Sequence, residues 1–218
     1  MLLGSSTKYG AGLRLAGDHT DLCDLYETIH YFVPENGLIP PHQDEFVLGL
    51  AYDVRHAYQG DRDTQLINNP NGSSIYFAVD ILWPIFLVQV AMLRAIAAYL
   101  PTTRSHQATL YRIEACIESA MNAIDANVSR KCCDWLHDFS PFPVGYLMSF
   151  VSQQSKLYVL AATTAKSRLR KLPEIISDIS PYSPAYKEYE TELRTIAEQQ
   201  KCSPDDLHDD SEWPKFKW

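Results

Sequence analysis

The sequence ILWPIFLVQVAMLRAIAAYL, from Ile81 to Leu100, is apolar apart from Gln89 and Arg94. Its longest unbroken apolar run, residues 81–88, is far shorter than the roughly 18 residues that a membrane span requires. Arg94 would also cost about 2.5–3.5 kcal/mol near the centre of a span. A helix that is apolar nearly all round, and does not cross a membrane, must be surrounded by other elements. We therefore expect a central core helix and no membrane segment.

Helical periodicity continues in the residues that follow. Pro101 ends the core helix, and apolar residues then recur at steps of three and four through 104–139. This pattern predicts either one long helix or two helices with a kink near 122–127. A further helix is expected from about 144 to 171, and a last one begins at Ser183-Pro184. The second half of the chain therefore predicts a helical bundle.

The first 80 residues mix strand and helix patterns. Strands are expected at 13–16 and 75–79, and helices through 22–33 and from about 44 to Gly60. We expect an α+β fold that is predominantly α-helical, with a small two- or three-stranded antiparallel sheet packed on a bundle of about five helices.

The absence of a polar linker or an internal repeat indicates one domain over residues 1–203. The sheet belongs to about 1–80 and the bundle to about 81–203. Residues 204–218 form an acidic and aromatic tail, whose end, WPKFKW, could dock on the body through its aromatic side chains.

Charge and cysteine content restrict the possible partners. The formal net charge of −8 argues against nucleic-acid binding, which requires a concentrated basic face. The one basic run, KSRLRK at 166–171, is interpreted as a solvated helix end. The five cysteines are odd in number and irregularly spaced, and the N-terminus does not have the pattern of a signal peptide. We expect reduced thiols and a cytoplasmic location.

The densest group of polar side chains is YDVRHAYQGDRD, residues 52–63, at the predicted end of a helix. Asp53 and His56 are neighbours at i,i+3, so the carboxylate could orient the imidazole as a general base. Arg55 and Arg62 could bind an anion, although a helix C-terminus repels anions. The alternative is that these charges form ion pairs that tie the helix exit to the next loop.

Two further groups are candidate ligands. Asp18 and His19 lie at a predicted strand end and could bind a ligand, although Asp18 is also suited to cap the next helix. Cys133 and His137 stand at i,i+4 and could share a zinc ion, but no paired motif supplies the remaining ligands of a structural site. Buried thiols beside a surface histidine are the alternative. Common nucleotide, hydrolase and zincin motifs are absent from the sequence, and we expect no cofactor.

Two segments are distinctive: AYDVRHAYQGDR at 51–62, with the element RHAYxGDR, and IYFAVDILWP at 75–84, with the element LWP. Both resemble segments of an uncharacterised family of bacterial proteins. The earlier Gly17-Asp18, Asp21-Leu22 and Leu25-Tyr26 fit the same resemblance, which covers roughly residues 10–100. It implies a bacterial origin and a shared scaffold, and it assigns no activity, cofactor or catalytic residue.

Two classes of function follow from these patterns. The first is an interaction or regulatory protein that acts through protein–protein contacts, with a protein partner or by self-association. The second is an enzyme or small-ligand sensor built on Asp53, His56, Arg55 and Arg62. The two classes differ in whether these side chains, with Asp18 and His19, line one water-accessible pocket.

Overall fold

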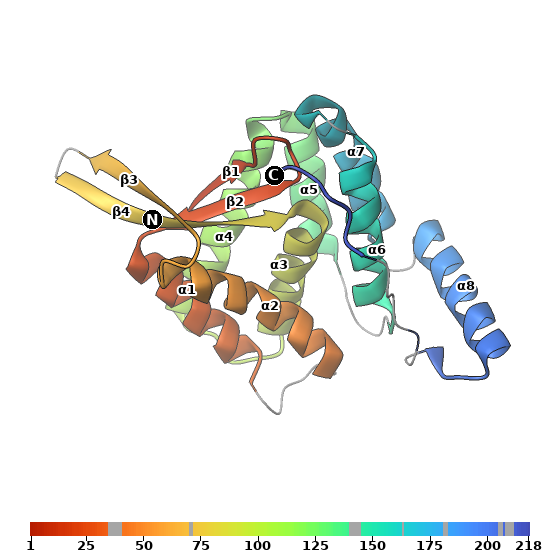
Figure 1. Cartoon of the computed structure of the whole chain (residues 1–218). Coiled ribbons are helices and arrows are strands. Elements are labelled where there is room, and N and C mark those ends of the chain that lie inside the picture. Colours follow the sequence, from red (N-terminus) through yellow and green to blue (C-terminus); the bar gives the residue numbers. More distant parts are fainter. Residues whose placement is uncertain are drawn as a thin grey trace.

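The computed structural model describes residues 1–34, 41–69, 72–139, 145–162, 164–180, 183–204, 207 and 212–218. In these residues the fold is α+β and mostly helical, with one antiparallel sheet (Figure 1). The strands are β1 (Leu3–Ser6), β2 (Gly12–Gly17), β3 (Asp63–Asn69) and β4 (Gly72–Leu82). The helices are α1 (His19–Phe32), α2 (Pro41–Tyr58), α3 (Trp83–Ala97), α4 (Arg104–Asn122), α5 (Ala126–Asp138), α6 (Leu147–Leu160), α7 (Ala165–Asp178) and α8 (Pro184–Gln200).

The predicted core helix is α3, which lies at the centre of the molecule. All but three of its fifteen residues are buried. It packs against α1, α2, α4, α5 and α6, and against β2 and β4. Its two internal polar side chains have partners: Gln89 donates to the Phe46 carbonyl at 2.8 Å, and Arg94 forms an ion pair with Glu114 at 2.6 Å. No helix in the described residues is long and apolar enough to cross a membrane.

The sheet has the strand order β1-β2-β4-β3, all antiparallel. Because side chains alternate across a strand, Leu13, Leu15, Val79 and Ile81 share one face, and all four are buried in the main core. Gly4 lies in β1 where an added Cβ would come within 2.3 Å of the Cys116 carbonyl oxygen of α4. The helices therefore press closely on this face of the sheet.

Four strands are present where two or three were expected. The strand at 13–16 is confirmed within β2, and the strand at 75–79 is confirmed within β4. The additional strands, β1 and β3, are the two outer strands of the sheet. Their sequences, LGSS and DTQLINN, contain few of the β-branched and aromatic residues that favour strands. Pairing with β2 and β4, rather than local preference, determines their conformation.

Two predicted helices differ in length from the structure. Of the two possibilities for 104–139, the divided one is confirmed: α4 ends at Asn122, and the Asp125 side chain caps α5. The prediction of a single helix over 144–171 was wrong. α6 ends at Leu160, and Thr164 caps α7, which continues to Asp178. The apolar spacing alone did not reveal this break, because α6 and α7 each bury a face of similar period.

Arg168 corrects the interpretation of the basic run as a solvated helix end. Its side chain is only 3% exposed and lies in the first turn of α7. Its guanidinium donates to the carbonyl oxygens of Tyr9 at 2.8 Å, Val159 at 3.0 Å, Ala162 at 2.9 Å and Lys217 at 3.2 Å. One side chain thereby joins the N-terminal loop, the end of α6 and the C-terminal tail.

The C-terminal tail docks on the body, as its aromatic composition predicted. The Tyr9 amide donates to the Trp218 carbonyl oxygen at 2.9 Å, and Phe216 packs against the main core. Figure 1 shows the tail running past α6 and α7 to reach the loop between β1 and β2.

The central position of α3 leads to a test of stability. Leu87 is fully buried, and Leu87→Ala should lower the free energy of unfolding by about 2–5 kcal/mol through lost burial and a residual cavity. Leu160→Ala removes the same atoms from a side chain that is 63% exposed, and should change stability by less than about 0.5 kcal/mol. Urea denaturation followed by circular dichroism measures both values. Equal losses in the two variants would contradict a core centred on α3.

Arg168 leads to a second test. Arg168→Met retains much of the apolar stem but leaves buried carbonyl groups without a donor, at about 1–3 kcal/mol each. We expect the free energy of unfolding to fall by at least about 2 kcal/mol, and limited trypsin digestion to cut faster after Lys215. Arg170→Met, in the same helix but exposed, is the matched control and should leave both measurements unchanged.

Candidate functional site

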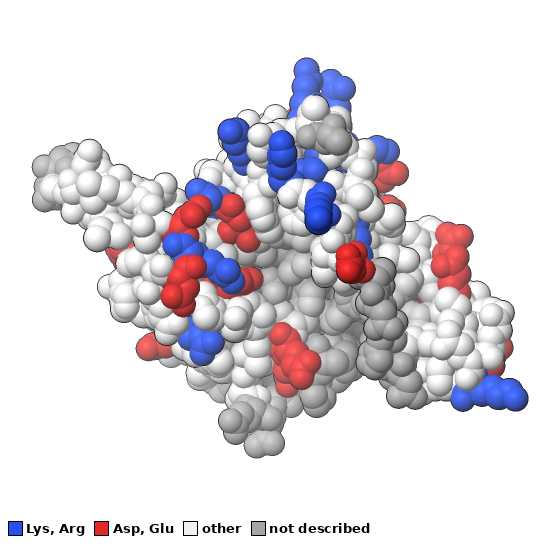
Figure 2. All heavy atoms as spheres, viewed as in Figure 1, with Lys and Arg blue, Asp and Glu red and all other residues white. Residues whose placement is uncertain are grey.

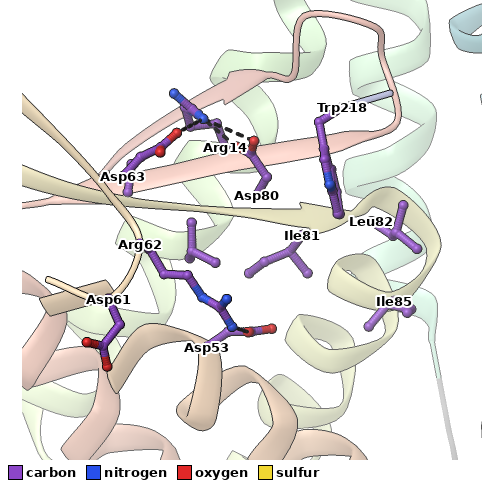
Figure 3. A pocket seen from close by; sticks show the side chains of 12 residues that line it. Arg14, Asp53, Asp61, Arg62, Asp63, Asp80, Ile81, Leu82, Ile85 and Trp218 are labelled. Carbon is purple, nitrogen blue, oxygen red and sulfur yellow. Dashed lines mark hydrogen bonds and ion pairs between the residues drawn. The ribbon is translucent and has the colours of Figure 1, made fainter. Parts of the chain in front are cut away.

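A groove of about 690 Å³ lies along β4, between the sheet and the neighbouring ends of α2 and α3 (Figure 3). Five consecutive β4 residues, Ala78 to Leu82, form one wall. The other lining residues are Arg14, Asp53, Asp61, Arg62, Asp63, Ile85 and Trp218. In Figure 2 acidic and basic side chains lie intermingled on this face, where α2 meets the sheet. The groove therefore combines charged groups from four separate segments with an apolar wall.

Arg14 bridges two aspartates at the rim of the groove. Its Nε lies 2.7 Å from Asp80, and its Nη2 lies 2.5 Å from Asp63. The hydrogen bond to Asp80 is the main cause of a raised pKa of Arg14; Asp63 adds to it, and burial opposes it. The sheet produces this cluster directly, because Arg14 and Asp80 are paired residues of adjacent strands on one face.

Asp53 and Arg62 form the second charged pair. The Arg62 guanidinium donates to the Asp53 carboxylate at 3.2 Å, across the groove from Arg14 (Figure 3). Burial raises the pKa of Asp53, although the charges of Arg62 and His56 act in the opposite direction. Asp53 therefore takes up a proton at a higher pH than an ordinary aspartate does.

The apolar part of the groove is formed by Ile81, Leu82, Ile85 and the indole of Trp218. Trp218 lies at the end of the groove that is far from Arg62 and Asp61, and its ring extends toward β4 (Figure 3). Its backbone is held by Tyr9, as described above, and its side chain remains 39% exposed. A bound group at this end would meet an aromatic face.

The structure separates the side chains predicted from residues 52–63. Asp53 and Arg62 line the groove, whereas His56 and Arg55 are not among its lining residues. The His56 Nδ1 lies 2.8 Å from the Asp61 carboxylate, and its ring packs on Tyr52 at 4.3 Å. The Arg55 guanidinium lies over the ring of Tyr52, with its Cζ 5.5 Å from the ring centroid. The carboxylate that orients His56 is thus Asp61, and the base proposed from Asp53 and His56 stays a prediction.

Asp18 and His19 lie elsewhere, at the start of α1. Asp18 caps the helix by accepting from the Asp21 amide at 2.9 Å. His19 packs edge-on against Tyr58 at 5.3 Å and lies 3.5 Å from the Cys23 sulfur. Neither side chain lines the groove, and their role in ligand binding stays a prediction.

Cys133 and His137 lie on α5, away from the groove. Burial is the main cause of a raised pKa of Cys133, which disfavours the thiolate that binds metal. In the part of the chain that the structure describes, no three His, Cys, Asp or Glu side chains gather as metal ligands.

Sequence reasoning missed Arg14, Asp80 and Trp218 as members of the site. Arg14 and Asp80 are 66 positions apart, and only the register of β2 against β4 brings them together. A usable signal was present, since each is an isolated charge within a strand that is otherwise largely apolar. The aromatic composition of the tail predicted that it could dock on the body, but it did not predict that Trp218 would line this groove.

Comparison with known protein families matched residues 2–218 to a domain of unknown function, DUF6904. Comparison with curated proteins and comparison with solved structures gave no match. The expected membership of an uncharacterised family is therefore confirmed, and the match extends well beyond residues 10–100. Since it covers nearly the whole sequence, the chain belongs to the DUF6904 family.

Proposed function

We propose that this protein is an interaction protein that binds a basic side chain of a partner protein in the groove along β4. The observation that carries the proposal is an unbalanced negative charge beside an apolar and aromatic wall. The groove contains two arginines and four aspartates, a formal balance of −2. Its chemistry therefore suits a lysine or arginine side chain better than an anion.

Both arginines are already paired within the groove. Arg14 contacts Asp80 and Asp63, and Arg62 contacts Asp53. The two most exposed carboxylates are those of Asp63, at 68%, and Asp61, at 56%. Asp63 contacts Arg14 and Asp61 contacts His56 through one carboxylate oxygen each, so an incoming cation would meet the other oxygen at that end of the groove.

The apolar wall supports the same ligand chemistry. Lysine and arginine carry apolar stems that pack along apolar surface while the charged end remains hydrated. The partly exposed Ile85 offers such a surface, and Trp218 offers a ring face for a cation–π contact, worth about 0.5–1 kcal/mol at an exposed site. The groove volume also falls within the range of roughly 300–1,000 Å³ typical of ligand sites.

The proposed setting is the bacterial cytoplasm. All five cysteines are free thiols, which supports a reducing compartment. A small amine that enters the same groove is the alternative ligand, and it corresponds to the sensor or enzyme class. The experiment below therefore includes a small amine beside the peptides.

Calorimetric titration with short peptides tests the proposal. The probe is an N-acetylated, C-amidated hexapeptide of alternating lysine and valine, and its control replaces each lysine with glutamate. We expect the lysine peptide to bind and the glutamate peptide not to bind. Asp61→Asn with Asp63→Asn should weaken binding roughly 2- to 30-fold, since exposed ion pairs contribute about 0.2–1 kcal/mol each.

The matched control is Asp134→Asn with Asp138→Asn, which makes the same change in net charge on the exposed surface of α5. This variant should retain the wild-type affinity. Equal weakening in both double variants would mean non-specific attraction to an acidic protein and would contradict the proposal. Butylamine that binds as tightly as the peptide would favour the small-ligand alternative.

The raised pKa of Asp53 predicts a pH dependence. A carboxyl group is negative above its pKa, so acidification neutralises Asp53 and makes the groove less negative. Affinity for the lysine peptide should therefore fall at a pH above the value of about 3.9 at which an ordinary aspartate titrates. Asp53→Asn should bind more weakly at neutral pH and lose this component. The difference between the wild-type and Asp53→Asn profiles isolates the contribution of Asp53, and identical profiles would refute its involvement.

A further inference from the structure

The edge of β4 that faces the groove has no neighbouring strand in the described residues. The pairing of β3 with β4 extends from Asn69 opposite Gly72 to Asp63 opposite Ala78, and stops there. Residues Val79 to Leu82 of β4 pair only with β2 on the other side. The same four residues form a wall of the groove. The groove thus occupies the position that a continuation of β3 would fill.

An open strand edge presents backbone N–H and C=O groups that can pair with another chain. Along a strand, alternate residues direct these groups toward one neighbour and then the other. The groups of β4 that point away from β2 within 79–82 therefore point into the groove. Among the described residues, none of them has a backbone partner outside the sheet.

We propose that the basic segment of the partner binds as an added β-strand along Val79 to Leu82. This inference rests on the proposed function and specifies the conformation in which the partner binds. Main-chain hydrogen bonds would supply affinity, and alternate side chains would supply specificity, as in other cases of strand addition. The partner is a protein segment with basic residues at alternate positions, because the groove is formally negative.

The side-chain pattern of β4 gives the expected pattern of the partner. Val79 and Ile81 lie on the face of the sheet that packs on the core, whereas Asp80 lies on the other face with Arg14. Neighbouring residues of paired strands share a face, so the added strand would place apolar side chains on the core-facing side, beside the partly exposed Ile85. The residues between them would point toward Asp80 and Asp63 and would be basic.

The two ends of the groove limit the length of the added strand. Arg62, Asp61 and Asp63 lie at one end and Trp218 at the other (Figure 3). The four β4 residues between these ends span about 13 Å at roughly 3.3 Å per residue. An added strand of four to six residues is therefore expected, which matches the hexapeptide probe.

Hydrogen exchange followed by mass spectrometry tests the backbone pairing directly. At saturation with the lysine and valine hexapeptide, the outward-pointing amides of residues 79–82 should exchange at least tenfold more slowly. The amides of α5 serve as the internal control and should not change. Two further peptides test the backbone donors. One carries N-methyl groups on the backbone amide nitrogens of all lysines, and the other carries them on the backbone amide nitrogens of all valines. One of them removes the donors that face β4 and should bind at least tenfold more weakly, while the other should bind as the parent peptide does.

The outcomes separate this inference from the function on which it rests. If the parent peptide binds but neither exchange nor N-methylation has an effect, then only side chains bind, and strand addition is refuted while the proposed function stands. If no lysine peptide binds, both are refuted. A third outcome is that light scattering shows a dimer and the amides of 79–82 are protected from exchange without peptide. The occupant of the edge is then a second copy of the chain, which also overturns the inference.

Discussion

The rest of the structure depends on the burial of α3, because a helix that is apolar on every side can be stable only when other elements enclose it. The contacts of α3 with five helices and two strands satisfy this requirement. The helix begins at Trp83, directly after β4 ends at Leu82, so the strand must run straight into the core. No loop separates the two elements, and the last residues of β4 are therefore fixed in position by α3. The groove owes its rigid wall to this connection.

A different connection, the one from α2 to β3, explains why the edge of β4 is open at this point. β3 cannot follow β4 beyond Ala78, because the chain reaches β3 from the end of α2 through Gly60, which has a φ of +83°. That turn and the charged residues after it occupy the space at one end of the groove. At the other end, the tail holds Trp218 in place through its hydrogen bond with Tyr9. Arg168 holds the tail and the loop of Tyr9 together through the carbonyl oxygens of Lys217 and Tyr9, although it lies outside the groove itself.

Whether a feature of the fold could be predicted depended on whether it arises from neighbouring residues or from the pairing of distant segments. Features that depend on local chemistry were predicted well: the core helix from its composition, the cap by Asp18, and the helix start at Ser183. Features that depend on distant pairing were missed. β1 and β3 have weak strand propensity, and they form because β2 and β4 offer them hydrogen-bonding edges. The candidate site was half predicted for the same reason: Asp53 and Arg62 belong to one local motif, whereas Arg14, Asp80 and Trp218 come together only in the folded chain.

The end of α2 adds a reason to expect a cation at the Asp61 end of the groove, whereas the N-terminus of α3, with the opposite partial charge, lies at the Trp218 end beside Leu82 and Ile85. A helix carries a partial negative charge at its C-terminus, from carbonyl groups that have no partner within the helix. Asp61, Arg62 and Asp63 follow α2 directly and line the groove, so this partial charge acts together with the aspartates. The arginines do not reverse the sign, since each is already paired with a carboxylate. In the proposed function, the charges of the groove that come from the 52–63 motif therefore serve a cation rather than the anion that the sequence suggested for Arg55 and Arg62.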